Sequence, residues 1–210
     1  MDETAYSYCA SPTSTITRNR ISGRKQVKKR LTVAVACSAD GSLKLPLFFV
    51  GRARQPRCFN SKSAEDLDLE YGNSPKGWMN TRLIQGWVSR LDARMRSENR
   101  KILLLLDNVS SHHAPETLTH VEIRKLPPNT TAHLQPVDAG IIRNFKSMIS
   151  KKKAVYYANQ LDEIPSRFEE DGQETLEGEL EAIVNVDVLV AMPWAQEAWA
   201  SVICTTISDR

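Results

Sequence analysis

Apolar and polar residues alternate in two segments near the start of the chain, and this period of two predicts two β-strands. The segments cover 27–38 and 43–50. Between them, Asp40 and Gly41 form a dipeptide that favours a tight hairpin turn. Pro46 cannot donate a backbone hydrogen bond, so we expect the second strand to lie at a sheet edge or to contain a bulge. The pattern therefore predicts an antiparallel hairpin.

The spacing of apolar residues changes to that of amphipathic helices further along the chain. A helix is predicted from Asn80 or Thr81 to about Asn99, with Asn80 or Thr81 as its N-cap. A longer helix is predicted from Asp138 to about Gln160. The remaining predictions are a long loop at 51–78, a short helix near 115–119, a strand at 121–126, a polar acidic connection at 161–173 and two short helices at 176–190 and 194–205, separated by Met192-Pro193.

Five consecutive aliphatic residues at 102–106 do not alternate, which predicts a central strand buried on both faces of a helix-covered sheet. Asp107 follows directly and is expected at the carboxyl edge of that sheet, where open α/β sheets bind ligands. Asp138 opens the long helix, and Asp2 lies at the start of the chain. Three separated carboxylates meeting at one edge would form a divalent-metal site, which points to phosphodiester chemistry.

Each of these aspartates also has a purely structural interpretation. Asp138 suits an N-cap of the long helix, and Asp107 suits a turn after its strand. Asp2 taken alone lies on a terminus, where chains commonly fray. The chemical interpretation therefore depends on the three residues acting together.

Composition narrows the class of protein. The chain has 210 residues, 41% hydrophobic and 25% charged, which suits one sizeable core. Its longest apolar run is too short to span a bilayer, so we expect no membrane partner. The four cysteines are scattered without a CxxC pair, which indicates free thiols of a cytosolic or nuclear protein.

Two neighbouring histidines, His112 and His113, follow Asp107 closely, and His120 and His133 lie further on. Their irregular spacing and the lack of matching cysteines disfavour a zinc site. We interpret His112 and His113 as loop histidines with satisfied hydrogen bonds. Contact of one of them with a substrate phosphate is the alternative.

The net charge of +3 conceals an asymmetry along the chain. Residues 1–160 contain 26 basic and 13 acidic residues, whereas residues 161–210 contain 2 and 12. A basic body suits a polyanionic partner such as DNA. The acidic tail is either a solvated helical face or a shield for the basic surface. The expected DNA-binding residues form two clusters, Arg24, Lys25, Lys28, Lys29 and Arg30 near the start, and Lys151, Lys152 and Lys153 on the long helix. Such clusters can also serve as nuclear-import signals. The alternative is that they are simply solvated surface residues.

Several motifs in the chain resemble those of one known family. They are MDET at 1–4, GWM at 77–79, ILLLLDN at 102–108, LPPNTT at 126–131 and QPVDAGIIRNFK at 135–146. In this order and spacing they resemble the DDE superfamily endonuclease domain of pogo/Tigger-type transposases and of their jerky and centromere-protein-B-like relatives. The resemblance covers nearly the whole chain.

The resemblance implies an α/β protein with an RNase H-like mixed sheet flanked by helices. It also implies that Asp2, Asp107 and Asp138 are the catalytic and metal-binding residues. Thirty residues separate Asp107 from Asp138, the spacing of the all-aspartate pogo branch. The implied cofactor is two Mg²⁺ or Mn²⁺ ions, with no organic cofactor. The implied reaction is DNA strand cleavage with water, or strand transfer with a DNA 3′-hydroxyl.

The chain also departs from the family pattern. Only Met1 precedes the first aspartate, so we expect the first strand to be largely missing and the chain to be a truncated copy. We expect residues 1–160 to form the endonuclease domain, and 161–210 an acidic connection and small helical extension of it. The resemblance implies a nuclear protein that binds DNA and self-assembles on it. An inactive, domesticated or decayed remnant that binds DNA or chromatin is the alternative.

Overall fold

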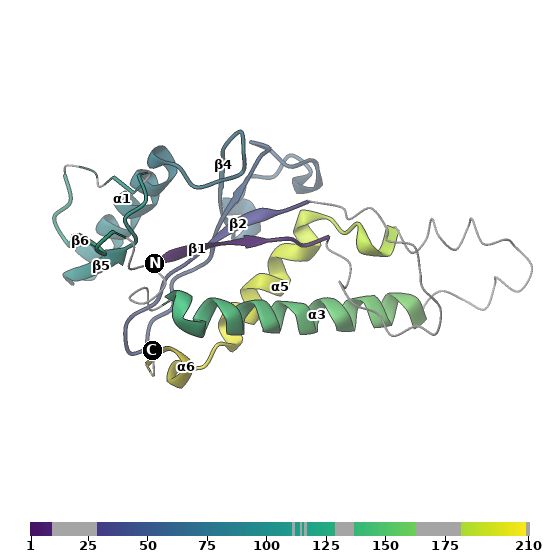
Figure 1. Cartoon of the computed structure of the whole chain (residues 1–210). Helices are drawn as coiled ribbons and strands as arrows, with labels where there is room; N and C mark the ends of the chain where they lie inside the picture. The colour runs from purple at the N-terminus through teal and green to yellow at the C-terminus, as the bar shows by residue number, and fades with distance from the viewer. Residues whose placement is uncertain are drawn as a thin grey trace, which may run out of the picture.

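A computed structural model describes residues 1–9, 29–110, 112–113, 115, 117–128, 137–162 and 182–208. Its elements follow in the order strand, strand pair, short helical turns, strand, long helix, parallel strand pair, and C-terminal helices (Figure 1). Strands and helices on both sides of a mixed sheet make this an α/β fold. No described helix combines the length and the apolar character needed to cross a membrane.

The larger sheet has four strands in the order of the chain. β1 (Asp2–Tyr6), β2 (Leu31–Val35) and β3 (Phe48–Gly51) are antiparallel neighbours, and β4 (Glu70–Asn73) is parallel to β3. The expected hairpin is therefore confirmed. The expectation of an edge position for its second strand is wrong, since β3 lies between β2 and β4 and begins two residues after Pro46. The hairpin turn contains Gly41 at a φ of 72°, and a Cβ there would lie 2.9 Å from the Cys204 backbone. This close approach lets the turn pack against the C-terminal helices.

The sequence led us to expect that the first strand would be largely missing, and the structure contradicts this. A five-residue strand is present, and Asp2 is its first residue, paired with Val35 of β2. β1 is also the last strand on its side of the described four-stranded sheet, rather than a central strand. The aspartate at position 2 is therefore built into regular structure.

A second, two-stranded sheet consists of β5 (Ile102–Leu106) and β6 (Val121–Lys125), which are parallel. The Met1 ammonium group links it to the larger sheet by donating to the Leu105 carbonyl at 3.0 Å. The prediction that β5 is buried on both faces is wrong, since Leu103 is 56% exposed and Leu105 37% exposed. Leu104 and Leu106 are buried, so only one face of β5 packs on the core.

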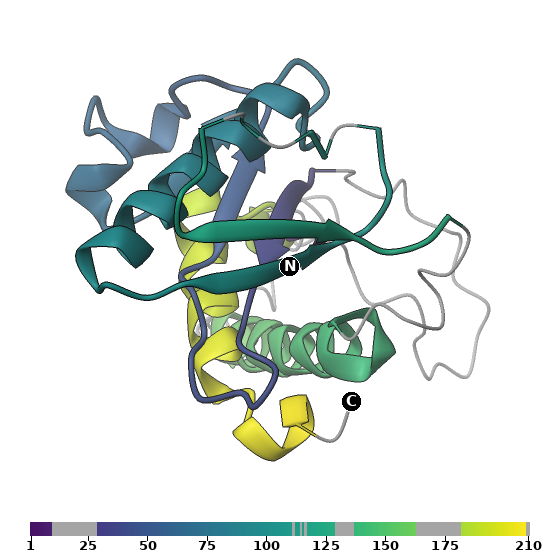
Figure 2. The same ribbon diagram turned by 90° about the vertical axis from the view of Figure 1, so that its left-hand side faces the viewer.

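Alternation along the strands divides the larger sheet into two apolar faces. Ala34, Phe48 and Val50 join a cluster with helix α1 and β5, whereas Val33 and Phe49 join a cluster with the C-terminal helices. Figure 2 shows α1 and the C-terminal helices on opposite sides of the sheet. Burial on both faces makes the sheet the centre of the fold.

Helix α1 (Thr81–Ser97) begins where the sequence predicts. Its N-cap is Asn80, whose side chain accepts from the Leu83 amide at 3.0 Å, which satisfies one of the unpaired donors at the helix start. Asp92 is a buried carboxylate within this helix. It accepts from three consecutive amides at the start of β6, and so holds the second sheet against α1; the donors are Thr119, His120 and Val121.

The C-terminal helices cover the other face. α3 (Ile142–Asp162) follows a π-helical turn, η3 (Val137–Ile141), and packs against α5 (Val188–Ser201); a short helix, α6 (Cys204–Ser208), ends the described chain. The rings of Phe145 and Trp199 meet edge to face, with centroids 5.9 Å apart. The predicted helix break at Pro193 is wrong, since Pro193 lies inside α5. Ala191, Met192 and Ala195 beside it are fully buried, and this packing holds the helix together across the missing amide.

The segment predicted as a long loop contains more structure than expected. It forms the 3-10 turns η1 (Arg57–Phe59) and η2 (Glu65–Leu67) as well as β4. The short helix expected near 115–119 does not appear among the described residues of that stretch. The acidic connection expected at 161–173 lies almost entirely outside the described residues.

Candidate metal site at the start of β1

Asp2 lies at the beginning of β1 and is 6% exposed. Its carboxylate Oδ1 accepts from the amide of Glu3 at 2.8 Å. Strand pairing with β2 fixes the backbone at this position, because each residue of β1 is in register with a partner. The carboxylate is therefore held by regular structure rather than by a loose terminus.

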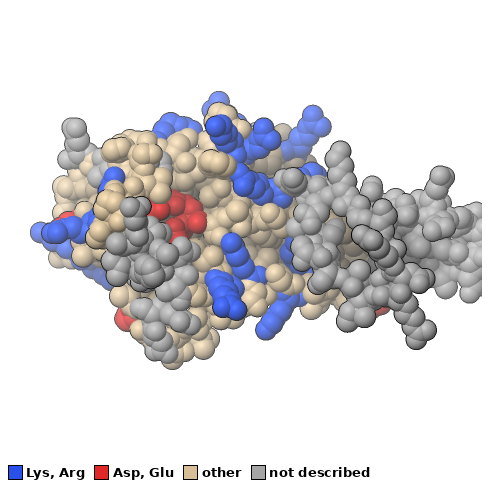
Figure 3. Space-filling model, viewed as in Figure 1, with Lys and Arg blue, Asp and Glu red and all other residues tan. Residues whose placement is uncertain are grey.

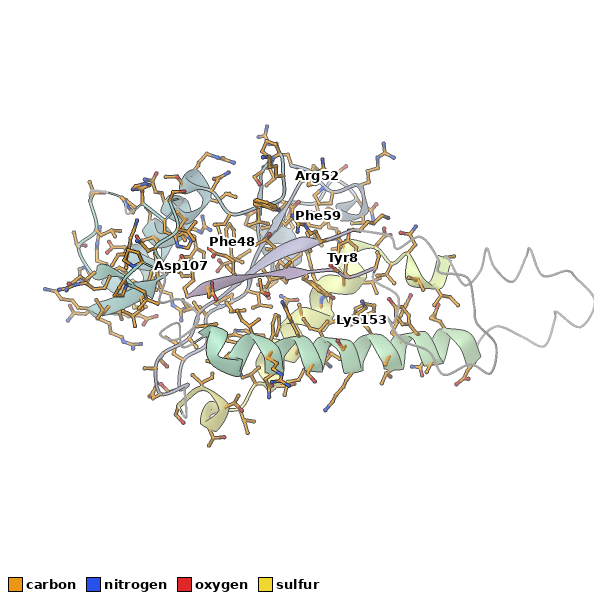
Figure 4. The ribbon with its side chains drawn as sticks, viewed as in Figure 1. Tyr8, Phe48, Arg52, Phe59, Asp107 and Lys153 are labelled. Carbon is orange, nitrogen blue, oxygen red and sulfur yellow. The ribbon has the colours of Figure 1, made fainter. Side chains whose placement is uncertain are left out.

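Asp107 lies directly after β5 and is 8% exposed (Figure 4). Its Oδ1 accepts weakly from the Val109 amide at 3.4 Å. The bond from the Met1 ammonium to Leu105 brings the beginning of β1 to the end of β5. Burial lowers the pKa of that ammonium, while the negative charges of Asp2, Glu3 and Asp107 oppose the change. The structure therefore places the start of β1, which contains Asp2, beside the end of β5, which Asp107 follows.

His112 joins the two strands at this corner and is 2% exposed. Its Nε2 lies 3.0 Å from Glu3 Oε1, and its Nδ1 lies 2.5 Å from Asp107 Oδ1. The second contact is at ion-pair distance but does not have hydrogen-bond geometry. Nδ1 of His112 therefore has no hydrogen-bond partner among the described residues. Burial lowers the pKa of His112, but the hydrogen bond and charge of Glu3 and the proximity of Asp107 outweigh it, so that the pKa is raised.

His112 is a buried loop histidine, and the expectation that its hydrogen bonds are satisfied holds for Nε2 but not for Nδ1 among the described residues. Glu3 is the residue that sequence reasoning missed. The only signal was its position beside Asp2 in a strand, where successive side chains point to opposite faces of the sheet. Nothing in the sequence links Glu3 to a histidine 109 residues away.

Asp138 lies inside the π-helical turn η3, rather than before its first residue. Its side chain is outside the described part of the structure, and so its position relative to Asp2 and Asp107 stays a prediction. Among the side chains that are described, no group of three His, Cys, Asp or Glu residues is arranged to hold a metal ion.

The predicted DNA-binding residues fall into different environments. Arg24, Lys25 and Lys28 lie outside the described residues. Lys29 donates to Asn185 Oδ1 at 2.7 Å, and the Arg30 guanidinium lies 5.2 Å from the centre of the Trp78 ring. Both residues are exposed, and their role in DNA binding stays a prediction.

The three lysines of α3 are also not equivalent. Lys151 is exposed, Lys152 forms an ion pair with Glu197 at 2.5 Å, and Lys153 donates to the Ser7 carbonyl at 3.2 Å. Figure 3 shows basic side chains spread over the face that contains α3, beside a compact acidic patch.

Known proteins resemble this chain along most of its length. It is 29% identical to Tigger transposable element-derived protein 4 of Mus musculus, over 69% of this chain and 28% of that protein. It is 29% identical to CENP-B homolog protein 2 of Schizosaccharomyces pombe, over 95% of this chain and 37% of that protein. It is 26% identical to ARS-binding protein 1 of the same yeast, over 100% of this chain and 39% of that protein. The chain thus spans less than two fifths of each of these relatives.

No solved structure matches the chain. Residues 28–210 match the family described as DDE superfamily endonuclease. The matched segment includes Asp107, its buried partner His112, and the helices that cover the sheet. Together with the transposon-derived relatives, this match confirms the resemblance seen in the motifs: the chain belongs to the DDE superfamily endonuclease family.

Proposed function

We propose that this chain is the catalytic domain of a metal-dependent DNA endonuclease that cleaves strands and transfers them. The observation that carries the proposal is the corner where β1 and β5 meet. It contains two buried aspartates from strands about a hundred residues apart, Asp2 and Asp107. Membership of the DDE endonuclease family supports the same chemistry.

The donor atoms at this corner fit a hard divalent cation. Asp2 and Asp107 provide carboxylate oxygens, which Mg²⁺ and Mn²⁺ prefer over nitrogen or sulfur ligands. Mg²⁺ is usually held by one or two carboxylates, with water and substrate phosphate completing its shell. Asp138 is the proposed third ligand, and two ions are the proposed complement.

The residues of the chain would have separate tasks in this reaction. A bound divalent ion supplies Lewis-acid activation of the phosphodiester and of the attacking oxygen. Asp2, at the start of a strand of the larger sheet, and Asp107, directly after a strand of the second sheet, would hold the ion. His112 holds Glu3 and Asp107 at a set distance from each other, and so maintains the spacing of those sheets. Burial of the two aspartates limits competition by bulk water.

DNA- or chromatin-binding without catalysis is the second candidate function. The observation that favours it is the 2.5 Å approach of His112 Nδ1 to Asp107 Oδ1. A histidine thus already lies at ion-pair distance from a proposed metal ligand. One relative, ARS-binding protein 1, is named for binding ARS. Under either function we propose DNA as the partner, self-assembly on it, and a nuclear location.

The test combines calorimetry and cleavage. Wild type is titrated with Mn²⁺ and incubated with supercoiled plasmid in Mg²⁺ or Mn²⁺, beside Asp107→Asn. Asp68→Asn is the matched control, because Asp68 is exposed and lies in the turn after η2. We expect saturable Mn²⁺ binding and plasmid nicking by wild type and the control, and neither by Asp107→Asn. A folded wild type that binds no Mn²⁺ overturns the catalytic proposal and leaves the second candidate.

A further inference from the structure

A groove runs between β1 and α3. We call it the β1–α3 groove, and it has a volume of about 230 Å³. One wall consists of consecutive residues of β1 and its continuation, from Thr4 to Ser7. The other wall is one face of α3, on which Phe145 and Ile149 belong to the apolar core. The groove therefore has an apolar floor and polar rims.

The β1 wall is an open strand edge. β1 pairs with β2 on one side, and no other described strand pairs with it on the opposite side. Natural proteins usually cover or charge such an edge, since it exposes unpaired backbone groups. Here the side chain of Lys153 crosses from α3 and donates to the Ser7 carbonyl at 3.2 Å. Figure 4 shows Lys153 between α3 and the end of β1.

Two lysines of α3 face this groove. Lys146 and Lys153 line it, and they are seven residues apart, which puts them on the same side of a helix. At 1.5 Å per residue their separation is about 10 Å along the helix axis.

The lysines of α3 lie on different faces of the helix, and only some of them line the β1–α3 groove. Lys152 is directed to Glu197 of α5, with which it forms an ion pair. Lys146 forms no ion pair with any described acidic residue. Burial lowers the pKa of Lys153, so that an anion in the groove would stabilise its charged form. The cationic residues of the groove are thus Lys146 and Lys153, rather than the consecutive Lys151, Lys152 and Lys153.

The groove leads toward the acidic corner. Its β1 wall begins at Thr4, two residues after Asp2. In Figure 3 the acidic patch lies beside the basic side chains over α3. Charge therefore changes sign along one path, from cations that suit a phosphate backbone to carboxylates that suit a metal ion.

We propose that the β1–α3 groove binds the backbone of one DNA strand, with Lys146 and Lys153 on its phosphates, and guides a phosphodiester to Asp2 and Asp107. The proposal rests on the proposed function, because it assigns a path to the DNA of that reaction. The groove and its charges also support DNA binding by a chain that does not cleave DNA.

The test is a DNA-binding titration by fluorescence anisotropy over a range of salt concentrations, using a labelled single-stranded oligonucleotide. The groove variant is Lys146→Gln with Lys153→Gln. The control is Lys62→Gln with Lys76→Gln, which removes the same charge from exposed positions between β3 and α1. We expect the groove variant to bind about tenfold more weakly, and its salt slope to fall by about one for each lysine. We expect the control to change affinity less than threefold.

A second variant keeps both lysines. Ala5→Asp adds a negative charge to the exposed β1 wall of the groove. We expect it to weaken binding comparably, with a thermal unfolding midpoint close to that of wild type. Equal losses in the groove and control variants, or wild-type affinity in the groove variant, overturn the proposal. The same holds if an RNA of the same sequence binds through these lysines and DNA does not.

Mn²⁺ calorimetry on the groove variant separates the two proposals. Unchanged Mn²⁺ binding with weakened DNA binding supports the groove. If the wild type binds no Mn²⁺ and the groove variant binds DNA more weakly than the wild type, only the catalytic proposal is contradicted. A wild type that binds Mn²⁺ through Asp107 and shows no effect of Lys146 and Lys153 contradicts the groove alone.

Discussion

The imidazole Nε2 of His112 lies 3.0 Å from Glu3 Oε1, although the two residues are 109 positions apart. His112 belongs to the segment after β5, and Glu3 belongs to β1. The contact therefore joins the two sheets at the corner that contains Asp2 and Asp107. It makes the separation of those aspartates depend on a residue that is not itself a proposed ligand.

Replacing His112 with alanine is expected to destabilise the fold by about 2–4 kcal/mol, because Glu3 and Asp107 are left facing each other without a counter-charge. The measurement is urea denaturation followed by circular dichroism. His113→Ala is the matched control, since His113 is the exposed neighbour. A His112→Ala chain as stable as the control would mean that the contact contributes nothing to folding.

Asp92 is expected to stabilise the protein at neutral pH and to lose this effect in acid. Its hydrogen bonds from the backbone of His120, Thr119 and Val121 lower its pKa from the ordinary 3.8. Because the unfolded state takes up a proton first as the pH falls, the stabilisation is complete above pH 3.8 and is lost below it. Asp92→Asn should therefore melt several degrees below wild type at pH 7, and the gap should narrow below pH 4.

The measurement for Asp92 is the thermal unfolding midpoint from pH 7 to pH 3, with Asp68→Asn as a surface control. Parallel midpoint curves for wild type and Asp92→Asn across that range would contradict the prediction.

Lys44 is expected to anchor the end of α5. Its ammonium donates to three carbonyls there, Trp199 at 2.9 Å, Ala200 at 2.7 Å and Val202 at 2.8 Å. A cation at a helix C-terminus also interacts favourably with the helix dipole. Lys44→Met should lower the free energy of unfolding by about 1–3 kcal/mol, measured by urea denaturation. Lys76→Met, at an exposed site, should change it by less than about 0.5 kcal/mol.

The tyrosines are expected to make the protein sensitive to alkali. Burial raises the pKa of Tyr8, Tyr71 and Tyr157 to about 12, and also raises that of Tyr6. The unfolded state loses these protons near pH 10, so the free energy of unfolding should fall as the pH rises from 10 toward 12. Tyr8→Phe removes one such group and should make the fall shallower. An absorbance titration that shows all phenols ionising near pH 10 in folded protein would refute this.

Local signals in the sequence predicted the elements that depend on near neighbours. The Asp40-Gly41 turn forms as expected, since it requires only two residues and the strands beside it. α1 begins at its predicted cap, because Asn80 bonds within one helical turn. The run at 102–106 forms a strand, as its apolar character requires.

Distant contacts decided the elements that were missed. β4 has no alternating pattern in Glu70–Asn73, and it is a strand because it pairs in parallel with β3. α5 continues through Pro193, because buried neighbours hold it against the sheet. The sequence of β5 also could not show that one of its faces is exposed. An apolar run shows that a strand can be buried, but not whether another element packs against each of its faces.

The sequence by itself determined the family and the basic character of the chain, because these follow from residue types and their order. The metal-binding role of the aspartates stays a prediction. Only the tertiary structure decided that Glu3 and His112 join Asp107, and that Lys153, but not Lys152, faces β1. The physical reason is separation along the chain. Side chains that are 50 to 150 residues apart meet only when the sheet and helices pack, and the direction of a lysine on a helix depends on what lies opposite it.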